Sequence, residues 1–213
     1  QGTKACYLDK RAREEGRAFT RFDYRGHGQS AGRFEDGTLG EWYADALAVC
    51  DQLTEGPLIV VGSSMGGWQT LLLARERPEK VAGIVTIAAA PDFTEDDMAA
   101  KFSEAQKSEM EKTGFVALPS DYGDPYIISR RLIEEGRNRL VLRAPLPLPF
   151  PARFLHGTAD TDVDLGFANR LIAHATGPDI RLTIVKGADH RFSTSDCLAL
   201  IAQSIAEVTE RIA

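Results

Sequence analysis

Cysteine is scarce in this sequence, with three residues among 213. Cys6, Cys50 and Cys197 are an odd number, occur in helix-like surroundings and lack the close spacing of metal ligands. The sequence therefore argues against a disulfide-stabilised secreted scaffold and against a cysteine-ligated metal site. We expect reduced, buried thiols of an intracellular protein and no metal.

An excess of positive charge and a long apolar run are also missing. The formal net charge is −6, which argues against a nucleic-acid partner and against a polybasic membrane segment. No apolar run approaches the length of a bilayer span and no signal peptide opens the chain, so we expect no membrane span. What remains is a globular composition, 43% hydrophobic and 26% charged, in a length that suits one domain with a modest insertion.

The most informative stretch surrounds Ser64. Leu58 to Val61 is a continuous apolar run, typical of a strand buried on both faces of a parallel sheet. It leads into a G-x-S-x-G pattern, Gly62-Ser63-Ser64-Met65-Gly66, and a helical segment, Trp68 to Ala74, follows at once. This order is typical of a nucleophile elbow, in which Ser64 is the nucleophile and the Met65 N–H faces an oxyanion. The alternative is a glycine-rich turn whose serine caps the next helix.

Strands and helices alternate along most of the remaining chain. Strands are predicted at Ala18–Asp23, Val81–Ala90, Ala152–His156 and Ile180–Val185. Helices are predicted at Ala5–Glu15, from a Thr38/Glu41 capping box to Leu53, at Val163–Ala175, and from the N-cap Ser193 to Ile212. This alternation predicts the α/β class, with a mostly parallel sheet flanked by helices.

Residues 91–150 interrupt the alternation and predict a small helical cap insertion. Asp92–Lys112 is charged and weakly amphipathic, a short helix follows at Ser129–Glu135, and the alternate prolines Pro145–Pro151 require extended backbone. We therefore assign residues 1–90 and 151–213 to the core and residues 91–150 to the cap. The candidate substrate-binding residues are Trp68 next to the elbow and Phe93, Met98 and Phe102 of the cap. The alternative for the cap residues is that they only pack the cap onto the domain.

A serine nucleophile needs a base, and four histidines are available. His174 falls inside a helix, His156 ends a strand before a glycine, and His27 lies in a Gly-His-Gly turn, so each has a structural explanation. His190 follows the last predicted strand, in the loop before the final helix. This is where the Ser-Asp-His order of such folds places the base, so we assign that role to His190.

The orienting acid should lie in the loop after the strand that ends at His156. Asp160 comes first in that loop and lies closest to the strand end, whereas Asp162 and Asp164 can cap the next helix. Asp92, after an earlier strand, is a rarer location. Asp160 is therefore favoured as the carboxylate that fixes the His190 tautomer and stabilises its imidazolium.

Together these segments resemble the α/β-hydrolase superfamily over most of the chain. The resemblance rests on the elbow at residues 62–68, the loop at residues 23–30, His156-Gly157 with Asp160, and Asp189-His190-Arg191. More narrowly, residues 2–5 and 77–81 are similar to a subgroup of mitochondrial acyl-glucuronide esterases and palmitoyl-protein thioesterases and its bacterial relatives. The resemblance implies an α/β-hydrolase fold, with Ser64 as nucleophile, Asp160 as acid and His190 as base.

The beginning of the chain departs from that pattern. Members of the superfamily begin with further strands, and the loop after one of them supplies a second oxyanion N–H. This sequence starts after that point, so we expect upstream residues to be missing from it, and Met65 is the one oxyanion donor that can be named.

The expected activity is a serine hydrolase that cleaves carboxylic esters or thioesters through an acyl-Ser64 intermediate, without a cofactor. The resemblance implies small acyl esters, acyl-glucuronides or S-acyl thiols as substrates. The expected location is the bacterial cytoplasm, or the mitochondrial matrix if the source is eukaryotic. One alternative is a different bond cleaved by the same triad, as in an amidase, a C–C hydrolase or a perhydrolase. The other is a non-catalytic α/β-hydrolase-fold protein that binds a ligand.

Overall fold

The computed structural model describes residues 2–119 and 125–212. The chain divides into two compact units, of which the first comprises residues 1–22, 49–91 and 141–213. The second comprises residues 23–48 and 92–140. The assignment of residues 91–150 to a functional cap stays a prediction.

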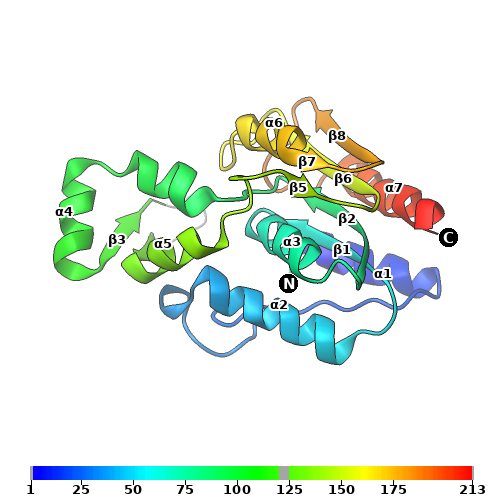
Figure 1. Cartoon of the computed structure of the whole chain (residues 1–213), viewed down its shortest axis with the longest axis horizontal. Coiled ribbons are helices and arrows are strands. Elements are labelled where there is room, and N and C mark those ends of the chain that lie inside the picture. Colours follow the sequence, from blue (N-terminus) through cyan, green and yellow to red (C-terminus); the bar gives the residue numbers. More distant parts are fainter. Residues whose placement is uncertain (1, 120–124, 213) are drawn as a thin grey trace. The chain divides into compact units, whose positions relative to one another are not determined.

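A four-stranded parallel sheet forms the centre of the first unit (Figure 1). Its strands are β1 (Leu58–Ser63), β2 (Val81–Ile87), β6 (Ala152–Gly157) and β8 (Ile180–Val185), in the spatial order β1-β2-β6-β8. Ser63 is opposite Ile87, and Gly157 is opposite Val185, so the carboxyl ends of the strands meet at one edge. The predicted mostly parallel sheet is confirmed.

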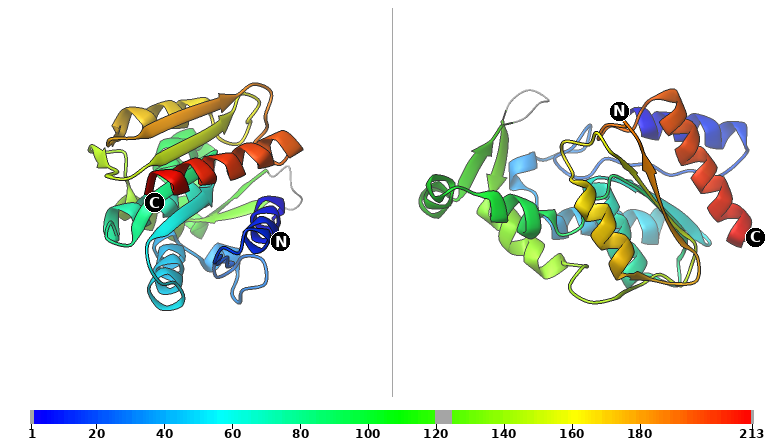
Figure 2. Two further views of the ribbon diagram at one scale, coloured as in Figure 1. Left: turned by 90° about the vertical axis from the view of Figure 1, so that its right-hand side faces the viewer. Right: turned by 90° about the horizontal axis from the view of Figure 1, so that it is seen from above.

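Helices cover both faces of this sheet. The right-hand view of Figure 2 shows α1 (Thr3–Glu14) and α7 (Ser195–Ile212) on one side, and α6 (Leu165–His174) on the other. The helix α3 (Met65–Glu76) connects β1 to β2, and β5 (Leu146–Pro147) pairs with β7 (Ala175–Thr176) as a short parallel ribbon. The fold therefore has the helix–sheet–helix layering that the alternating sequence predicts.

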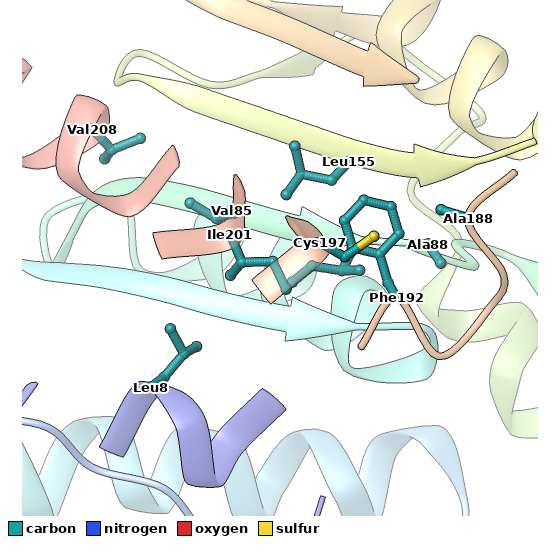
Figure 3. Close-up of a cluster of buried hydrophobic side chains, with 10 residues drawn as sticks. Leu8, Val85, Ala88, Leu155, Ala188, Phe192, Cys197, Ile201 and Val208 are labelled. Carbon is teal, nitrogen blue, oxygen red and sulfur yellow. The ribbon is translucent and has the colours of Figure 1, made fainter. Parts of the chain in front are cut away.

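Apolar side chains from α1, β2, β6 and α7 form a core on one face of the sheet (Figure 3). Leu8, Val85, Leu155 and Ile201 belong to this cluster. The loop after β8 contributes Ala188 and Phe192, which are 7% and 0% exposed. These two residues flank His190 at a distance of two positions on either side, so burial of the loop fixes the backbone that carries it.

The second unit consists of short helices and one hairpin. It contains η1 (Phe34–Asp36), the first part of α2 (Leu39–Leu53), the π-helical segment η2 (Thr94–Ala99), α4 (Glu104–Thr113), α5 (Arg130–Gly136) and η3 (Arg137–Arg139). The strands β3 (Phe115–Leu118) and β4 (Tyr126–Ser129) pair antiparallel in the hairpin. The helix predicted at Ser129–Glu135 is confirmed, with Ser129 as its N-cap, whereas the hairpin was not predicted.

Three local predictions are wrong. Ala18–Asp23 forms no strand, because no strand in the described part of the chain pairs with it and its residues are exposed. Thr194, rather than Ser193, is the N-cap of α7. Its hydroxyl oxygen accepts a hydrogen bond from the Cys197 N–H, three residues further along, at 3.3 Å. Cys6 lies on the exposed side of α1, whereas Cys50 and Cys197 are buried as expected, and all three are free thiols.

Candidate active site

Ser64 occupies a strained turn between β1 and α3. Its backbone has φ 56° and ψ −122°, a conformation that costs a residue other than glycine about 1–3 kcal/mol. Hydrogen bonds to the end of β2 and to the segment after it hold Ser64 there: Ser64 N–H donates to Ile87 O at 2.9 Å, and Ala90 N–H donates to Ser64 O at 3.2 Å. The Ser64 side chain makes no capping hydrogen bond to α3, which argues against the helix-cap alternative.

Close packing explains two glycines of the elbow. A Cβ at Gly62 would lie 2.1 Å from Gly66 O and 2.3 Å from Thr70 Oγ1. A Cβ at Gly67 would lie 2.6 Å from Ala89 Cβ, whereas a Cβ at Gly66 would meet no described atom within 4 Å beyond the nearby backbone of its own helix. The elbow therefore depends on Gly62 and Gly67, although the G-x-S-x-G pattern marks Gly62 and Gly66.

Met65 supplies the amide that follows the serine. It is the first residue of α3, and the N–H groups of the first helical turn have no acceptor within their own helix. The positive end of the helix dipole adds to the field at this amide. The position therefore suits an oxyanion donor.

Two loops bring Asp160 and His190 together. Asp160 lies in the loop after β6, and His190 lies in the loop after β8. The loops are joined by hydrogen bonds from Ala159 N–H to Ala188 O at 3.0 Å and from Gly187 N–H to Thr158 Oγ1 at 2.9 Å. Gly157 permits this approach, because a Cβ there would lie 2.1 Å from Ala188 O.

Asp160 and His190 form a direct hydrogen-bonded pair. His190 Nδ1 is 2.9 Å from Asp160 Oδ2 and 3.1 Å from Oδ1. The Asp160 side chain has no exposed surface, and its Oδ1 also accepts the N–H groups of Val163 at 2.8 Å and Asp162 at 3.0 Å. The structure therefore brings together the aspartate and the histidine that the sequence analysis singled out.

Electrostatics favour the ionised form of Asp160. Burial raises the pKa of its carboxyl, but hydrogen bonds from His190, Val163 and Asp162, together with the charge of His190, outweigh it, so the pKa lies below the ordinary value. An ionised carboxylate only accepts hydrogen bonds, so the proton of a neutral His190 resides on Nδ1. Nε2 is then the basic nitrogen.

The other aspartates considered in the sequence take different positions. Asp164 caps α6, where its Oδ1 accepts the Gly166 N–H at 2.7 Å. Asp162 Oδ2 is 3.9 Å from His190 Nε2, on the side of the ring away from Asp160. Asp92 is fully buried with φ 62° and belongs to the second unit. Asp160, by contrast, hydrogen-bonds Nδ1 of His190.

The remaining histidines contact backbone carbonyl groups, as their sequence positions suggest. His27 Nδ1 is 3.1 Å from Arg25 O, and His174 Nδ1 is 2.9 Å from Arg170 O. His156 Nε2 is 3.0 Å from Val163 O. His156 Nε2 also lies 3.6 Å from Asp160 Oδ2, a proximity that the sequence analysis did not predict.

The candidate substrate-binding residues are distributed over both units. Trp68 has no exposed surface in α3, so it packs inside the protein in this structure. Phe93, Met98 and Phe102 are half-buried in the second unit, at and beside η2. Their role in binding an acyl group stays a prediction.

No described group of three or more His, Cys, Asp and Glu side chains is arranged to hold a metal ion. No described helix is both long and apolar enough to cross a membrane.

Comparison with known families agrees with this architecture. A family model described as alpha/beta hydrolase fold matches residues 5–137. Among solved structures, a hydrolase candidate from Agrobacterium vitis S4 superposes with a TM-score of 0.94 at 37% sequence identity, covering 97% of this chain and 82% of that one. The chain therefore belongs to the α/β-hydrolase family, and the predictions of this fold and of a hydrolase enzyme are confirmed.

Within that family, the chain is similar to the mitochondrial palmitoyl-protein thioesterase ABHD10. The human protein is 33% identical over 216 residues, which cover 99% of this chain and 69% of the relative. The mouse protein is 35% identical, with coverage of 99% and 71%. The solved structure of the mouse alpha/beta hydrolase domain-containing protein 10 has a TM-score of 0.91 at 32% identity, covering 100% of this chain and 86% of that one. The predicted resemblance to this subgroup is confirmed.

Proposed function

We propose that the chain is a serine hydrolase that cleaves carboxylic thioesters and esters through an acyl-Ser64 intermediate. The observation that carries the proposal is the Asp160–His190 pair, 2.9 Å apart, at the same edge of the sheet as the strained Ser64. A carboxylate bonded to Nδ1 leaves Nε2 as a base, and a serine at an elbow is the nucleophile that such a base activates.

The steps follow from these positions. His190 Nε2 takes the proton of Ser64 Oγ while the oxygen attacks the acyl carbon, and the Met65 N–H stabilises the oxyanion. His190 then gives that proton to the departing thiol or alcohol, which leaves the acyl group on Ser64. Water attacks the acyl-enzyme with His190 again as base, which releases the carboxylic acid and restores the serine. Asp160 stabilises the imidazolium in each half of the cycle.

The relatives support a thioester as the preferred bond. The similar proteins from human and mouse are named palmitoyl-protein thioesterases, so we propose S-acyl thiols as the first substrate class to examine and small acyl esters as the second. Their name also includes a mitochondrial location, which supports the mitochondrial alternative for this chain. The bacterial cytoplasm stays a prediction.

A panel of substrates tests the reaction. We would measure turnover of p-nitrophenyl esters and S-acyl thioesters of increasing chain length, beside matched anilides and a β-diketone. We expect thioesters and esters to be hydrolysed, and Ser64→Ala to reduce the rate to that of buffer. Preferential cleavage of the anilide or the diketone would contradict the proposed bond in favour of an amidase or a C–C hydrolase. Tight binding without turnover would favour the ligand-binding alternative.

The same panel examines the candidate acyl-binding residues. If Met98 and Phe102 contact the acyl chain, alanine substitutions raise KM for long chains and leave short-chain turnover unchanged, since each lost apolar contact weakens binding. Equal changes for all chain lengths would contradict a role in binding the acyl chain.

A further inference from the structure

A second histidine lies against Asp160. His156 is in β6, four residues before Asp160, and its residue surface is 1% exposed. Its Nε2 is 3.0 Å from Val163 O and 3.6 Å from Asp160 Oδ2. Its Nδ1 is buried without a hydrogen-bond partner in the described structure.

These contacts determine the tautomer of His156. A carbonyl oxygen only accepts, so the proton of the neutral ring is on Nε2 and is donated to Val163 O. Nδ1 is then an unprotonated acceptor that is buried in the described structure. The positive end of the Nε2–H dipole lies beside Asp160 Oδ2, the oxygen that is nearer to His190 Nδ1.

His156 also closes the loop that carries Asp160. The chain leaves β6 after Gly157, and Val163 returns to the His156 ring through its carbonyl group. The Val163 N–H meanwhile donates to Asp160 Oδ1 at 2.8 Å. Val163 therefore links the ring to the carboxylate, and Oδ1 is held by the loop while Oδ2 faces His190.

The unpaired Nδ1 argues against a purely structural reason for a histidine here. A buried polar atom without a partner costs free energy, whereas an apolar side chain would fill the same position without that cost. A lysine or arginine could donate to Val163 O, but its fixed charge would compete with His190 for Asp160. A neutral imidazole donates at this position without adding a permanent charge.

We propose that His156 is a positioning residue for Asp160: it holds the loop of residues 158–163 so that Asp160 Oδ2 meets His190 Nδ1. This inference rests on the proposed function, because it assigns His156 to the support of the proposed triad. His156 acts through Asp160 and does not touch the reacting atoms.

The test uses the rate at which a fluorophosphonate probe labels Ser64, measured from pH 5 to 9. The variant His156→Phe keeps a ring and loses both nitrogens. His156→Gln carries an amide N–H that can reach Val163 O, whereas His156→Asn carries the same amide one methylene shorter. Phe154→Leu is the control, because Phe154 lies on the same face of β6, is 2% exposed and is remote from Asp160 in the hydrogen-bond network. Thermal unfolding of every variant accompanies the rates.

We expect His156→Phe to slow labelling about 10- to 100-fold, as loss of an orienting partner typically does. Its pH profile should shift to lower pH, because a poorly oriented carboxylate stabilises the imidazolium of His190 less well. His156→Gln should recover most of the rate and the profile, and His156→Asn should not. Phe154→Leu should lower the Tm while its rate and profile stay within about two-fold of the unaltered protein.

Four outcomes would overturn the inference or its basis. Labelling of His156→Phe at the unaltered rate and profile would contradict a positioning role. Losses in all variants that follow the Tm, including Phe154→Leu, would show that His156 only supports the fold. If His156→Phe does not fold, equal rates for the Gln and Asn variants would contradict the role. Absence of labelling in the unaltered protein would instead overturn the proposed function.

Discussion

Asp160 combines full burial of its side chain with several hydrogen bonds. Two backbone amides and His190 donate to it, and its pKa is lower in the folded protein than its ordinary value of about 3.9. The ionised carboxylate therefore stabilises the fold above about pH 5. That contribution is lost as the pH falls through about 4 towards the folded pKa, because the unfolded chain then binds the proton more readily.

Asp160→Asn separates this effect from catalysis. The amide oxygen can still accept the N–H groups of Val163 and Asp162, but the side chain no longer titrates. We expect the free energy of unfolding, measured in urea at pH 3 to 7, to depend less on pH in the variant than in the unaltered protein. We also expect esterase turnover at pH 7 to fall about 10⁴-fold, because His190 would adopt the wrong tautomer. An identical pH dependence of stability would contradict the lowered pKa of Asp160.

At the scale of secondary-structure elements, the two glycines of the turn between β1 and α3 differ in how closely they are packed. Gly62→Ala would place a Cβ 2.1 Å from Gly66 O, so we expect a loss of about 1–3 kcal/mol of stability and of Ser64 reactivity. Gly66→Ala adds a methyl group in open space within a helix, so we expect a change within about 0.5 kcal/mol and retained reactivity. Urea unfolding and probe labelling of the two variants test this. Equal damage from both substitutions would contradict the packing at the elbow.

The link between β6 and α7 depends on a buried arginine. Arg153 is 3% exposed, and its guanidinium lies 3.0 Å from Asp179 Oδ2 and 3.2 Å from Glu207 Oε2. We expect Arg153→Met to lower the free energy of unfolding by about 1.5–3 kcal/mol, since buried hydrogen bonds to charged groups are lost.

Arg181→Met provides the matched control for Arg153→Met. The Arg181 side chain contacts the same two carboxylates but is 52% exposed, so its loss should cost less than about 1 kcal/mol. Similar costs for both variants in urea unfolding would contradict the importance of burial.

Over the whole molecule, the sequence predicted the parts whose signal is local. A strand at Leu58–Val61 was predicted from a short apolar run, and the structure has β1 there. Asp160 and His190 were chosen because each lies in the loop after a predicted strand, and the structure brings them together. Ala18–Asp23 has the alternation of a strand but lacks a described partner, which alternation alone does not reveal. The dependence on Gly67 instead of Gly66 arises from the approach of Ala89, a contact that no motif encodes.

The sequence also did not predict which distant segments of the chain form one compact unit. Residues 23–48 form one compact unit with residues 92–140, and this unit is held by contacts such as the Gly40 N–H with Glu135 Oε2, at 2.6 Å, and Arg131 with Glu41, at 2.9 Å. The ring of His156 likewise meets Asp160 only because the loop turns back on itself at Val163. Residue order predicted a structural role for this histidine and not its proximity to the acid.

The most direct measurement of the central claim is covalent labelling with a fluorophosphonate, followed by intact mass and peptide mapping. The account predicts one adduct per chain on Ser64, absent from Ser64→Ala and strongly reduced in His190→Ala, because the serine is reactive only when His190 takes its proton. An adduct on another residue, or equal labelling of Ser64 with and without His190, would contradict the account.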